Sequence, residues 1–476
     1  MLVCTSKLSM SKRYKYLIIG SGPTGLGAAY RLKELGVSDF RILEQEGYIG
    51  GLATSFVDPK GFTWDVGGHV QFSHYDYFDK LMHKALGDDG WLTHQRESWV
   101  WMKNRFVPYP FQNNIRYLPK DSMWNCLKGI IDNYQNPPAD DTKPKNFEQW
   151  ILATFGQGIA DEFMLPYNFK VWAYPPSEMA YNWIGERVAV TDLKRVTENI
   201  LYEKDDLSWG PNNTFQFPKF GGTGAIWKSV GENLIGNHFF DLNTKVTKID
   251  ADAKVVYMQN GETIGFDYLI STIPIDTLYR TIENAPEALT KSASELKHSR
   301  TNIVGIGLKG KPKPELATKC WMYFPENNSP YYRITVFSNY SPNNVPDINT
   351  QWSLMAETSE SSAKPVDREL LISNTVKAML EDGLIENEAD VVSEFLVSYE
   401  YGYPTPSVNR DEILNPLRTW CETKNIFSRG RFGAWKYEVS NQDHSLMQGV
   451  ELINKLELGE AEITIDFPAI ANAGKR

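Results

Sequence analysis

The chain has 476 residues, of which 42% are hydrophobic and 23% charged, and its formal net charge is −10 at pH 7. This length exceeds what a single hydrophobic core organises, so two or three domains are expected. The acidic balance argues against nucleic acid or an anionic membrane as the main partner. No apolar run reaches the length of a membrane span. Residues 1–12 lack the apolar core of a signal peptide and resemble a disordered extension.

The four cysteines, Cys4, Cys126, Cys320 and Cys421, are widely separated and include no Cys-x-x-Cys pair. This spacing favours reduced thiols in a cytoplasmic protein over a disulfide framework. The seven histidines show no metal-ligand spacing, so no metal is expected. The sequence leaves the oligomeric state open.

The most informative stretch is a glycine-rich turn near the N-terminus. An apolar run at residues 17–19 precedes Gly20, Gly22 and Gly25, and helical periodicity follows. In a dinucleotide-binding unit these glycines permit a tight turn, close approach of a pyrophosphate and close packing of helix on strand. A second apolar run ends at Glu44, where a carboxylate can accept hydrogen bonds from a ribose. The pattern therefore predicts a strand–turn–helix that binds a dinucleotide.

A second glycine turn, Gly50-Gly51-Leu52, follows closely behind Glu44. Nicotinamide-binding folds do not need this turn, whereas flavoproteins use one like it to lay an extended cofactor through the protein. The pair of turns favours FAD over NAD.

The middle of the chain changes periodicity. Residues 99–111 alternate in the manner of strands of a second sheet, and residues 120–202 become helical around a Pro-rich linker at 137–144. Gly221-Gly222-Thr223-Gly224 opens another helix, which we interpret as a return to the cofactor domain and not as a second phosphate site.

Further along, residues 245–249 and 255–258 predict a hairpin around Asn260-Gly261. Residues 301–403 predict short alternating strands with one helix at 367–380. We therefore expect an α/β fold with a Rossmann-like FAD-binding domain, a helical domain and an antiparallel-sheet substrate domain. Their expected boundaries are 14–97, 215–295 and 422–476 for the first, 117–214 for the second, and 98–116 with 296–421 for the third.

Gly67-Gly68-His69 falls where the chain should pass the flavin ring. Two glycines there would allow backbone carbonyls to approach an isoalloxazine and to move. Taken alone, His69 fits a structural role better than a catalytic one.

Several long strings carry a resemblance. They include Gly67-Gly68-His69-Val70-Gln71-Phe72-Ser73-His74, Val107-Pro108-Tyr109-Pro110-Phe111-Gln112, Pro166-Tyr167-Asn168-Phe169-Lys170-Val171-Trp172 and Ser440-Asn441-Gln442-Asp443-His444-Ser445. Over nearly its whole length beyond the N-terminal extension, the chain resembles the UDP-galactopyranose mutase family, in its eukaryotic branch.

The resemblance implies FAD as cofactor, with a carbonyl of the His69 loop as the hydrogen-bond partner of flavin N5. The cofactor-binding residues that it implies are Gly20, Gly22, Thr24, Gly25, Glu44, Gly51, Leu52, Gly67, Gly68, His69, Val246, Arg431, Asn441, Gln442, Asp443 and Ser445.

The resemblance also implies UDP-galactose, in its pyranose and furanose forms, and UDP as ligands. Arg187 and Arg333 would hold the diphosphate, because a guanidinium offers planar bidentate geometry to phosphate oxygens, and the hydroxyls of Tyr403 and Tyr437 would complete the cradle. Tyr323 would stack on uracil. Other residues implied to bind substrate are Phe72, Tyr109, Phe111 and Gln112 around the uridine, and Asn168, Trp172 and Asn212 around the sugar. Taken alone, each arginine suits a surface ion pair better, and Tyr323 suits core packing as well.

The reaction implied is the interconversion of UDP-galactopyranose and UDP-galactofuranose, with His69, Arg187, Arg333, Tyr403 and Tyr437 as the catalytic set. In that family, reduced FAD attacks the anomeric carbon through N5, and a covalent flavin N5–sugar adduct opens and re-closes. NADPH is implied as reductant. Two rivals stay open from the residues alone: a flavin oxidase or desaturase on the same scaffold, and a binding protein like the Rab GDP-dissociation inhibitors.

Residues 184–191 and 208–214 each combine a glycine with a candidate ligand-binding residue, Arg187 or Asn212. Loops of this kind often close over a bound substrate. We expect both segments to act as flaps.

Overall fold

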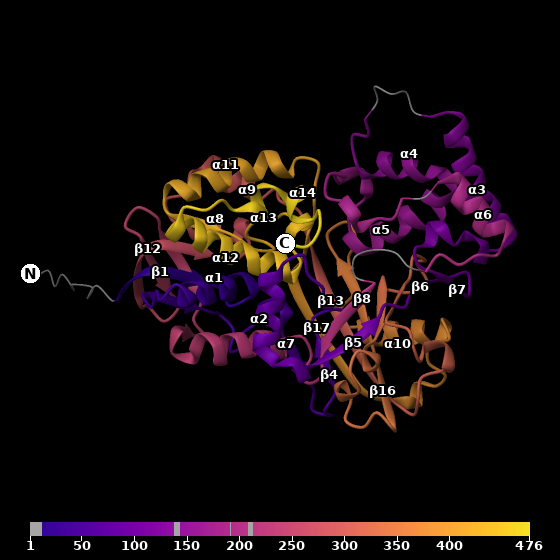
Figure 1. The fold of residues 1–476 in the computed structure, drawn as a ribbon, viewed down its shortest axis with the longest axis horizontal. Coiled ribbons are helices and arrows are strands. Elements are labelled where there is room, and N and C mark those ends of the chain that lie inside the picture. Colours follow the sequence, from indigo (N-terminus) through magenta and orange to yellow (C-terminus); the bar gives the residue numbers. More distant parts are fainter. Residues whose placement is uncertain (1–11, 138–142, 191, 208–212) are drawn as a thin grey trace, which may run out of the picture. The chain divides into compact units, whose positions relative to one another are not determined.

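The computed structural model describes residues 12–137, 143–190, 192–207 and 213–476, and it divides into two compact units (Figure 1). Unit 1 comprises the described parts of Met1–Leu52, Trp227–Leu296 and Arg410–Gly474, and unit 2 comprises those of Ala53–Ile226, Lys297–Asn409 and Lys475–Arg476. Residues 53–97 and 215–226, expected in the cofactor domain, group with unit 2. The finer division into three domains stays a prediction. The expected N-terminal extension, except for Lys12, lies outside the described residues.

Unit 1 is built on a seven-stranded sheet. In spatial order its strands are β10 (Val246–Asp250), β11 (Val255–Met258), β12 (Thr263–Ser271), β1 (Arg13–Ile19), β2 (Phe40–Leu43) and β9 (Phe240–Asp241), with β18 (Ile426–Ser428) beside β12. β12, β1 and β2 run parallel and are almost fully buried where they pair, as their apolar runs predict. The predicted Rossmann-like core is therefore present.

The hairpin prediction was wrong in one detail. β10 and β11 do pair antiparallel, but Asn260-Gly261 joins β11 to β12 and not β10 to β11. Gly261 has φ +85°, a conformation that glycine adopts at little cost, so the turn forms where the glycine lies.

The helical elements of unit 1 surround this sheet. They are α1 (Pro23–Glu34), η8 (Val230–Gly236), η9 (Asn237–Phe239), α8 (Ile275–Thr281), α9 (Glu287–Ala293), α11 (Arg410–Thr423), η14 (Tyr437–Val439), α12 (Gln442–Leu458), α13 (Ile463–Asp466) and α14 (Pro468–Ala471). η1 (Gly51–Ala53) and α7 (Gly224–Ser229) each continue from one unit into the other. α1 and α12 lie side by side (Figure 1), because Gly27 and Gly449 let the two backbones touch.

Unit 2 is built on a second seven-stranded sheet. In spatial order its strands are β17 (Val391–Pro404), β13 (His298–Lys309), β16 (Gln351–Glu360), β15 (Arg333–Val336), β14 (Trp321–Tyr323), β6 (Ser98–Met102) and β7 (Arg105–Pro108). Two separate two-stranded antiparallel sheets accompany it: β3 (Ser55–Val57) with β4 (Thr63–Asp65), and β5 (Trp91–Gln95) with β8 (Thr214–Pro218). The pairing is antiparallel except between β14 and β6.

The expectation of short strands was wrong for three of these. β13, β16 and β17 have 12, 10 and 14 residues, because each finds partners along its length. The expected helix at 367–380 is α10 (Leu371–Glu381). It begins later because the Asp367 carboxylate accepts hydrogen bonds from the N–H groups of Glu369 and Leu370 in a preceding turn.

The two faces of this sheet carry different kinds of side chain. Alternate residues of β16, among them Leu354 and Ala356, pack in the apolar core beneath α10. Since successive side chains of a strand point to opposite faces, Met355, Glu357 and Ser359 lie on the other face. The same alternation in β15 sends Ile334 and Val336 to the core and Arg333 and Thr335 to the opposite face.

The helical segments of unit 2 include the predicted helical stretch, α3 (Lys120–Gln135), α4 (Phe147–Ile159), η5 (Ala160–Met164), α5 (Leu165–Trp172) and α6 (Leu193–Leu201), which gather in one group (Figure 1). The others are α2 (Asp76–Leu86), η2 (Asp88–Gly90), η3 (Phe111–Asn113), η4 (Ile115–Tyr117), η6 (Pro176–Glu178), η7 (Gly185–Arg187), η10 (Pro314–Leu316), η11 (Phe337–Asn339), η12 (Pro342–Asn344) and η13 (Glu388–Asp390). α3 and α4 cross at Gly129 and Gly156, where any side chain would collide with the other backbone. A π-helical turn, η5, then connects α4 to α5.

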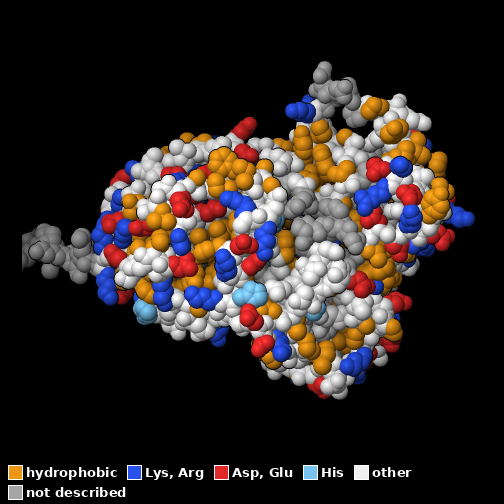
Figure 2. All heavy atoms as spheres, viewed as in Figure 1, with side chains coloured by type: hydrophobic (Ala, Val, Ile, Leu, Met, Phe, Trp, Pro, Cys, Tyr) orange, Lys and Arg blue, Asp and Glu red, His pale blue; other side chains and the backbone are white. Residues whose placement is uncertain are grey.

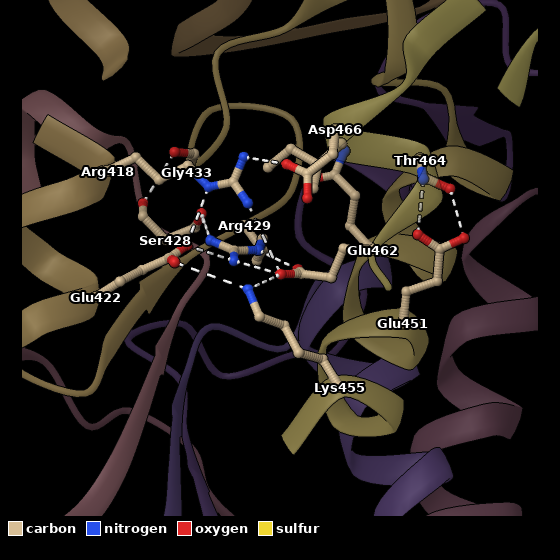
Figure 3. A network of polar contacts seen from close by, with 12 residues as sticks. Arg418, Glu422, Ser428, Arg429, Gly433, Glu451, Lys455, Glu462, Thr464 and Asp466 are labelled. Atoms are coloured by element: carbon tan, nitrogen blue, oxygen red, sulfur yellow. Dashed lines mark hydrogen bonds and ion pairs between the residues drawn. The ribbon is translucent and has the colours of Figure 1, made fainter. Parts of the chain in front are cut away.

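A buried ion network stabilises the end of unit 1 (Figure 3). The Arg429 guanidinium, which follows β18 and is fully buried, donates to both carboxylate oxygens of Glu462 at 2.6 and 2.8 Å and to Glu422 at 2.7 Å. Lys455 also donates to Glu462, at 2.8 Å. The network thus ties the residue before Gly430 to the segment that follows α12.

The charged surface is mixed. On the face drawn in Figure 2, basic and acidic side chains are interspersed over the described residues. Among the described residues, no helix combines the length and apolar composition that crossing a membrane requires.

Arg429→Met should lower the free energy of unfolding by about 3–5 kcal/mol, because it leaves buried carboxylates without their main partner. Arg13→Met is the matched control, since the Arg13–Asp267 pair is about half exposed and is expected to contribute less than about 1 kcal/mol. Denaturant unfolding of both variants measures the difference. Equal losses would contradict a stabilising role for the buried network.

Acid should destabilise the protein partly through Glu462. Burial opposes ionisation of this carboxyl, but the charge of Arg429 outweighs it and lowers the pKa of Glu462 from 4.5 to about 2. The folded state therefore holds this proton less tightly than the unfolded state, so the stabilisation is present above about pH 4.5 and is lost as the pH falls toward 2. It amounts to roughly 3 kcal/mol. Glu462→Gln should flatten the pH dependence of unfolding in that window, and an unchanged slope would refute the assignment.

Candidate functional site

The first glycine turn of unit 1 has the geometry of a phosphate-binding turn. Gly20 has φ +97°, and a side chain at Gly25 would overlap the Gly20 carbonyl. α1 starts at Pro23, its N-cap is Gly22, and no side chain caps it. Its first-turn N–H groups and positive dipole end therefore suit an anion.

Glu44 directly follows β2, which ends at Leu43, and is 7% exposed. Its carboxylate accepts hydrogen bonds from the Ser21 N–H and hydroxyl, both at 2.8 Å, and from the Glu46 N–H at 2.9 Å. A carboxylate offers about four acceptor positions, so one remains for a ribose hydroxyl. The residues present fit the adenosine end of a dinucleotide.

The second glycine turn lies against the first, because Gly51 approaches the Cα atom of Gly22. Gly430 lies against Thr24 at the start of α1, and its N–H donates to Gln448 of α12 at 2.7 Å. Segments distant in the sequence thus meet at the start of α1. The structure brings the predicted residues Gly22, Thr24 and Gly51 together.

The remaining predicted cofactor residues of unit 1 lie on η1, on β10, at the start of α12 and in the segment after β18. Asn441 is the N-cap of α12 and makes no capping bond through its side chain, while Gln442 accepts a hydrogen bond from the Trp227 indole at 2.6 Å. Arg431 donates to the Ser440 hydroxyl at 2.9 Å. Leu52 lies in η1, Val246 begins β10, and Asp443 and Ser445 are buried in α12.

In unit 2, the Gly67-Gly68-His69 loop lies over the face of the second sheet that carries Arg333, Thr335 and Glu357. The Gly68 N–H donates to the Glu357 carboxylate at 3.0 Å, and a side chain at Gly68 would come within 2.7 Å of the Thr335 hydroxyl. The Gly67 carbonyl accepts from the His69 N–H at 2.8 Å. The loop therefore lies directly against β15 and β16.

Arg333 is the centre of a polar cluster on this face. Its Nε and Nη2 atoms each donate to Glu357 at 2.7 Å. The Tyr332 hydroxyl donates to Glu357 at 2.8 Å and lies 3.5 Å from the Tyr403 hydroxyl, and the Tyr403 ring meets Trp172 edge-on at 5.8 Å. The structure thus brings together Arg333, Tyr403 and Trp172 of the predicted set.

The charges in this cluster are mutually stabilised. Burial alone would lower the pKa of Arg333, but the Glu357 carboxylate and the Tyr403 and Tyr332 hydroxyls raise it well above its usual value. Burial likewise opposes ionisation of Glu357, yet the guanidinium lowers the pKa of that carboxyl. Both groups stay charged at neutral pH.

An aromatic group lies beside this cluster. The Tyr323 ring lies 5.1 Å from Tyr109 and 5.4 Å from Tyr167, and Arg96 stacks over Tyr109 at 5.6 Å. Burial raises the pKa of Tyr323 and of Tyr167, so both hydroxyls stay protonated and can donate. Phe111 stacks on Phe163 and is fully buried.

Other predicted substrate residues have local partners. Gln112 is 1% exposed and its amide donates to the Ala189 carbonyl, which ties η3 to the predicted flap at 184–191. The Asn168 amide donates to the Met164 carbonyl at 2.7 Å. Phe72 lines a hollow of about 340 Å³ together with Phe215 and residues of α2.

Three further predicted residues do not enter the contacts described above. Arg187 is half-buried in η7, Tyr437 belongs to η14 of unit 1, and Asn212 lies outside the described residues, as does most of the predicted flap at 208–214. Sequence reasoning missed Glu357, Tyr332 and Arg96. For Glu357, the available signal was a carboxylate directly after the apolar run Leu354-Met355-Ala356.

Comparisons with known proteins fit this geometry. The family model of the flavin containing amine oxidoreductases matches residues 23–448. A crystal structure of reduced UDP-galactopyranose mutase is similar at 48% sequence identity, with a TM-score of 0.94 and 98% of each chain covered. The chain belongs to the UDP-galactopyranose mutase family, within the flavin containing amine oxidoreductases. This membership confirms the resemblance, the α/β fold class and a flavin as the cofactor.

More distant similarities bear on the fold of the mutase family. A putative protoporphyrinogen oxidase from Exiguobacterium sp. 255-15 aligns at a TM-score of 0.68 and 15% identity, covering 95% of this chain and 100% of the other. The probable flavin-containing monoamine oxidase A of Dictyostelium discoideum is 24% identical over 297 residues, which is 58% of this chain and 60% of that protein. The mutase fold is therefore shared with proteins that are named as oxidases.

Gly22→Ala should abolish flavin binding without unfolding the apoprotein. The nearest atoms to an added Cβ are 3.9 Å away and φ is −73°, so the apoprotein accommodates alanine, whereas the added methyl group blocks close approach of a pyrophosphate. Flavin absorbance per protein and the melting temperature of the apoprotein measure the two effects. Gly36→Ala, in an open turn with φ +75°, should keep full flavin content and lose about 1 kcal/mol of stability. A Gly22→Ala variant with full flavin content would show that the pyrophosphate binds elsewhere.

Proposed function

We propose that this protein is a flavin-dependent isomerase that interconverts UDP-galactopyranose and UDP-galactofuranose. The observation that carries the proposal is the 48% identity, over 98% of both chains, to a reduced UDP-galactopyranose mutase. The Arg333 cluster supports it independently, because an amine substrate gives no reason to place a partly buried guanidinium beside tyrosine hydroxyls.

FAD is the proposed cofactor. Gly20, Gly22, Thr24 and Gly25 would bind its pyrophosphate, and Glu44 its ribose, for the reasons of geometry given above. When bound and reduced, FAD supplies a nucleophilic N5 atom to the anomeric carbon of the sugar. NADPH as reductant and a cytoplasmic location stay predictions.

In unit 2, Arg333 and Arg187 would bind the diphosphate and stabilise the charge that develops on UDP as its bond to the sugar breaks. The hydroxyl of Tyr403 would donate to the same oxygens, and a role for Tyr437 of unit 1 stays a prediction. Tyr323 and Tyr109 would provide the aromatic surface for uracil, which is worth on the order of 1–3 kcal/mol per stacked base.

The sugar side of the proposed site is formed by Asn168 and Trp172. An amide donor and an apolar indole face suit a galactose ring, which has hydroxyls on its edge and C–H groups on its faces. Closure of residues 184–191 over UDP would exclude water from the reacting sugar. The Gln112 amide donates to the Ala189 carbonyl, so uridine bound beside Gln112 would affect the position of residues 184–191 through this hydrogen bond.

The direct test is an isomerase assay with the purified flavoprotein. Protein reduced with dithionite or NADPH should convert UDP-galactofuranose to UDP-galactopyranose, whereas oxidised protein should be inactive, because only reduced flavin has a nucleophilic N5. Equal turnover by oxidised, oxygen-saturated protein would refute the flavin mechanism. Oxidation of amines with hydrogen peroxide release, and no isomerisation, would instead place the protein among the oxidases.

Replacement of the two arginines should weaken UDP binding while leaving the flavin content unchanged. Arg333→Lys keeps the charge but loses the planar fork, so the Kd for UDP should rise about 10–100-fold. Arg187→Ala should cost roughly 2–5 kcal/mol of binding free energy. Arg368→Ala is the control, since the half-exposed Arg368 side chain pairs at 3.7 Å with Glu360 at the end of the strand β16. Calorimetry gives the affinities, and unchanged affinity in both test variants would contradict the diphosphate assignment.

A further inference from the structure

The carboxylate of Glu357 lies between two parts of the proposed site. It is 2% exposed and accepts four hydrogen bonds. Oε1 accepts from the Gly68 N–H at 3.0 Å and from Arg333 Nε at 2.7 Å, and Oε2 accepts from Arg333 Nη2 at 2.7 Å and from the Tyr332 hydroxyl at 2.8 Å. One buried side chain therefore contacts both the glycine loop and the guanidinium.

Only an ionised carboxylate fits this position without loss. A carboxylate is an acceptor at both oxygens and offers about four acceptor positions, which matches the four donors. An amide of the same size would turn one end into a donor that faces other donors. Aspartate would keep the charge and both oxygens, but it is one methylene shorter and cannot reach all four donors at once.

The same contacts set the orientation of the guanidinium. Arginine has five N–H donors, and Glu357 accepts from two of them, on Nε and Nη2. The three remaining N–H donors are then available to a ligand in one fixed orientation. Without Glu357, the side chain would have to be ordered by the ligand itself, at a cost in affinity.

The loop is held by the same carboxylate. Gly67 has φ +107°, and an added Cβ there would lie 3.4 Å from Glu357 Oε2, while the Gly68 N–H bonds to Oε1. A movement of the Gly67–Gly68 peptide must therefore break or redirect a bond to the carboxylate that holds Arg333.

We propose that Glu357 is a positioning residue that couples the Gly67-Gly68-His69 loop to the phosphate-binding guanidinium of Arg333. The inference rests on the proposed function, which places the loop beside the flavin and the guanidinium beside the diphosphate. Through Glu357, a change in the loop alters the affinity for UDP, and bound UDP alters the loop by the same coupling free energy, since such linkage is reciprocal.

The test compares Glu357→Gln and Glu357→Asp with wild-type flavoprotein in two readouts, the Kd for UDP by calorimetry and the visible absorption spectrum of the bound flavin. In Glu357→Gln the Kd should rise at least tenfold and the flavin absorption maxima should shift. Glu357→Asp should change both readouts in the same directions by smaller amounts. It also serves as the test variant if the glutamine variant does not fold.

Glu360→Gln is the matched control. Glu360 ends the same strand and pairs with Arg300 and Arg368 at 3.9 and 3.7 Å, so its replacement removes one charge from β16 away from the loop. In this variant the Kd for UDP should stay within twofold of wild type, and the flavin absorption spectrum should be unchanged.

A Glu357 variant that shifts only one readout would overturn the coupling, because a residue that merely orders Arg333 would leave the flavin spectrum unchanged. If wild-type protein binds UDP and Glu357→Gln has the same Kd for UDP and the same flavin spectrum, this inference alone is overturned. Wild-type protein that does not bind UDP would overturn the proposed function itself.

Discussion

The proposed substrate half of the site depends on one ion pair formed across two strands, between a buried carboxylate and a partly buried guanidinium. Arg333 of β15 and Glu357 of β16 are directly opposite in the antiparallel register, so the backbone pairing itself brings the two charges together. A buried charge is costly without a partner, and breaking such a pair costs more than the pair gains. The register is in turn fixed by the other face of the sheet, because a slip of one residue would send Glu357 into the core beneath α10.

β16 also fixes α5, the helix that carries the residues proposed to face the sugar. The Ser359 hydroxyl, two residues beyond Glu357 on the same face, donates to the Lys170 carbonyl of α5, and the Ser361 hydroxyl donates to the Ala173 carbonyl at 2.5 Å. The Lys170 amine donates to the Glu326 carbonyl at 2.6 Å, and burial lowers the pKa of this amine to about 7. Asn168 and Trp172 are therefore held by β16, as Arg333 is. The strand thus sets the spacing between the groups proposed to bind phosphate and those proposed to face the sugar.

The sequence was informative where function depends on local chain geometry. The turn at Gly20, Gly22 and Gly25 and the acidic residue at Glu44 could be predicted because strand, turn and helix are consecutive, and each glycine has its own steric reason. Glu357 could not be predicted, because its role arises from pairing with a strand more than twenty residues away and from a loop at Gly68. Strand lengths after residue 297 were underestimated for the same reason, since partners along the sheet extend a strand. Residue strings that resemble a family supplied Arg333 and Tyr403, which no local pattern would have distinguished from surface groups.

The glycine turns lie in unit 1, and the polar cluster of Arg333 and Glu357 lies in unit 2. This separation explains why the fold alone does not identify the reaction. A fold retained at 15% identity in a putative protoporphyrinogen oxidase cannot determine the substrate. The glycine turns of unit 1 answer a requirement common to flavoproteins, which is to hold a dinucleotide. In the proposed function, the charges on the face of the second sheet opposite α10 would answer a requirement particular to a diphosphate-bearing substrate. Because that face is polar at Arg333 and Glu357 and apolar on its reverse, its polar positions can differ between relatives without disturbing the core. Specificity in this chain is therefore expected to lie in β15, β16 and the loops above them, and not in the glycine motif by which such proteins are first recognised.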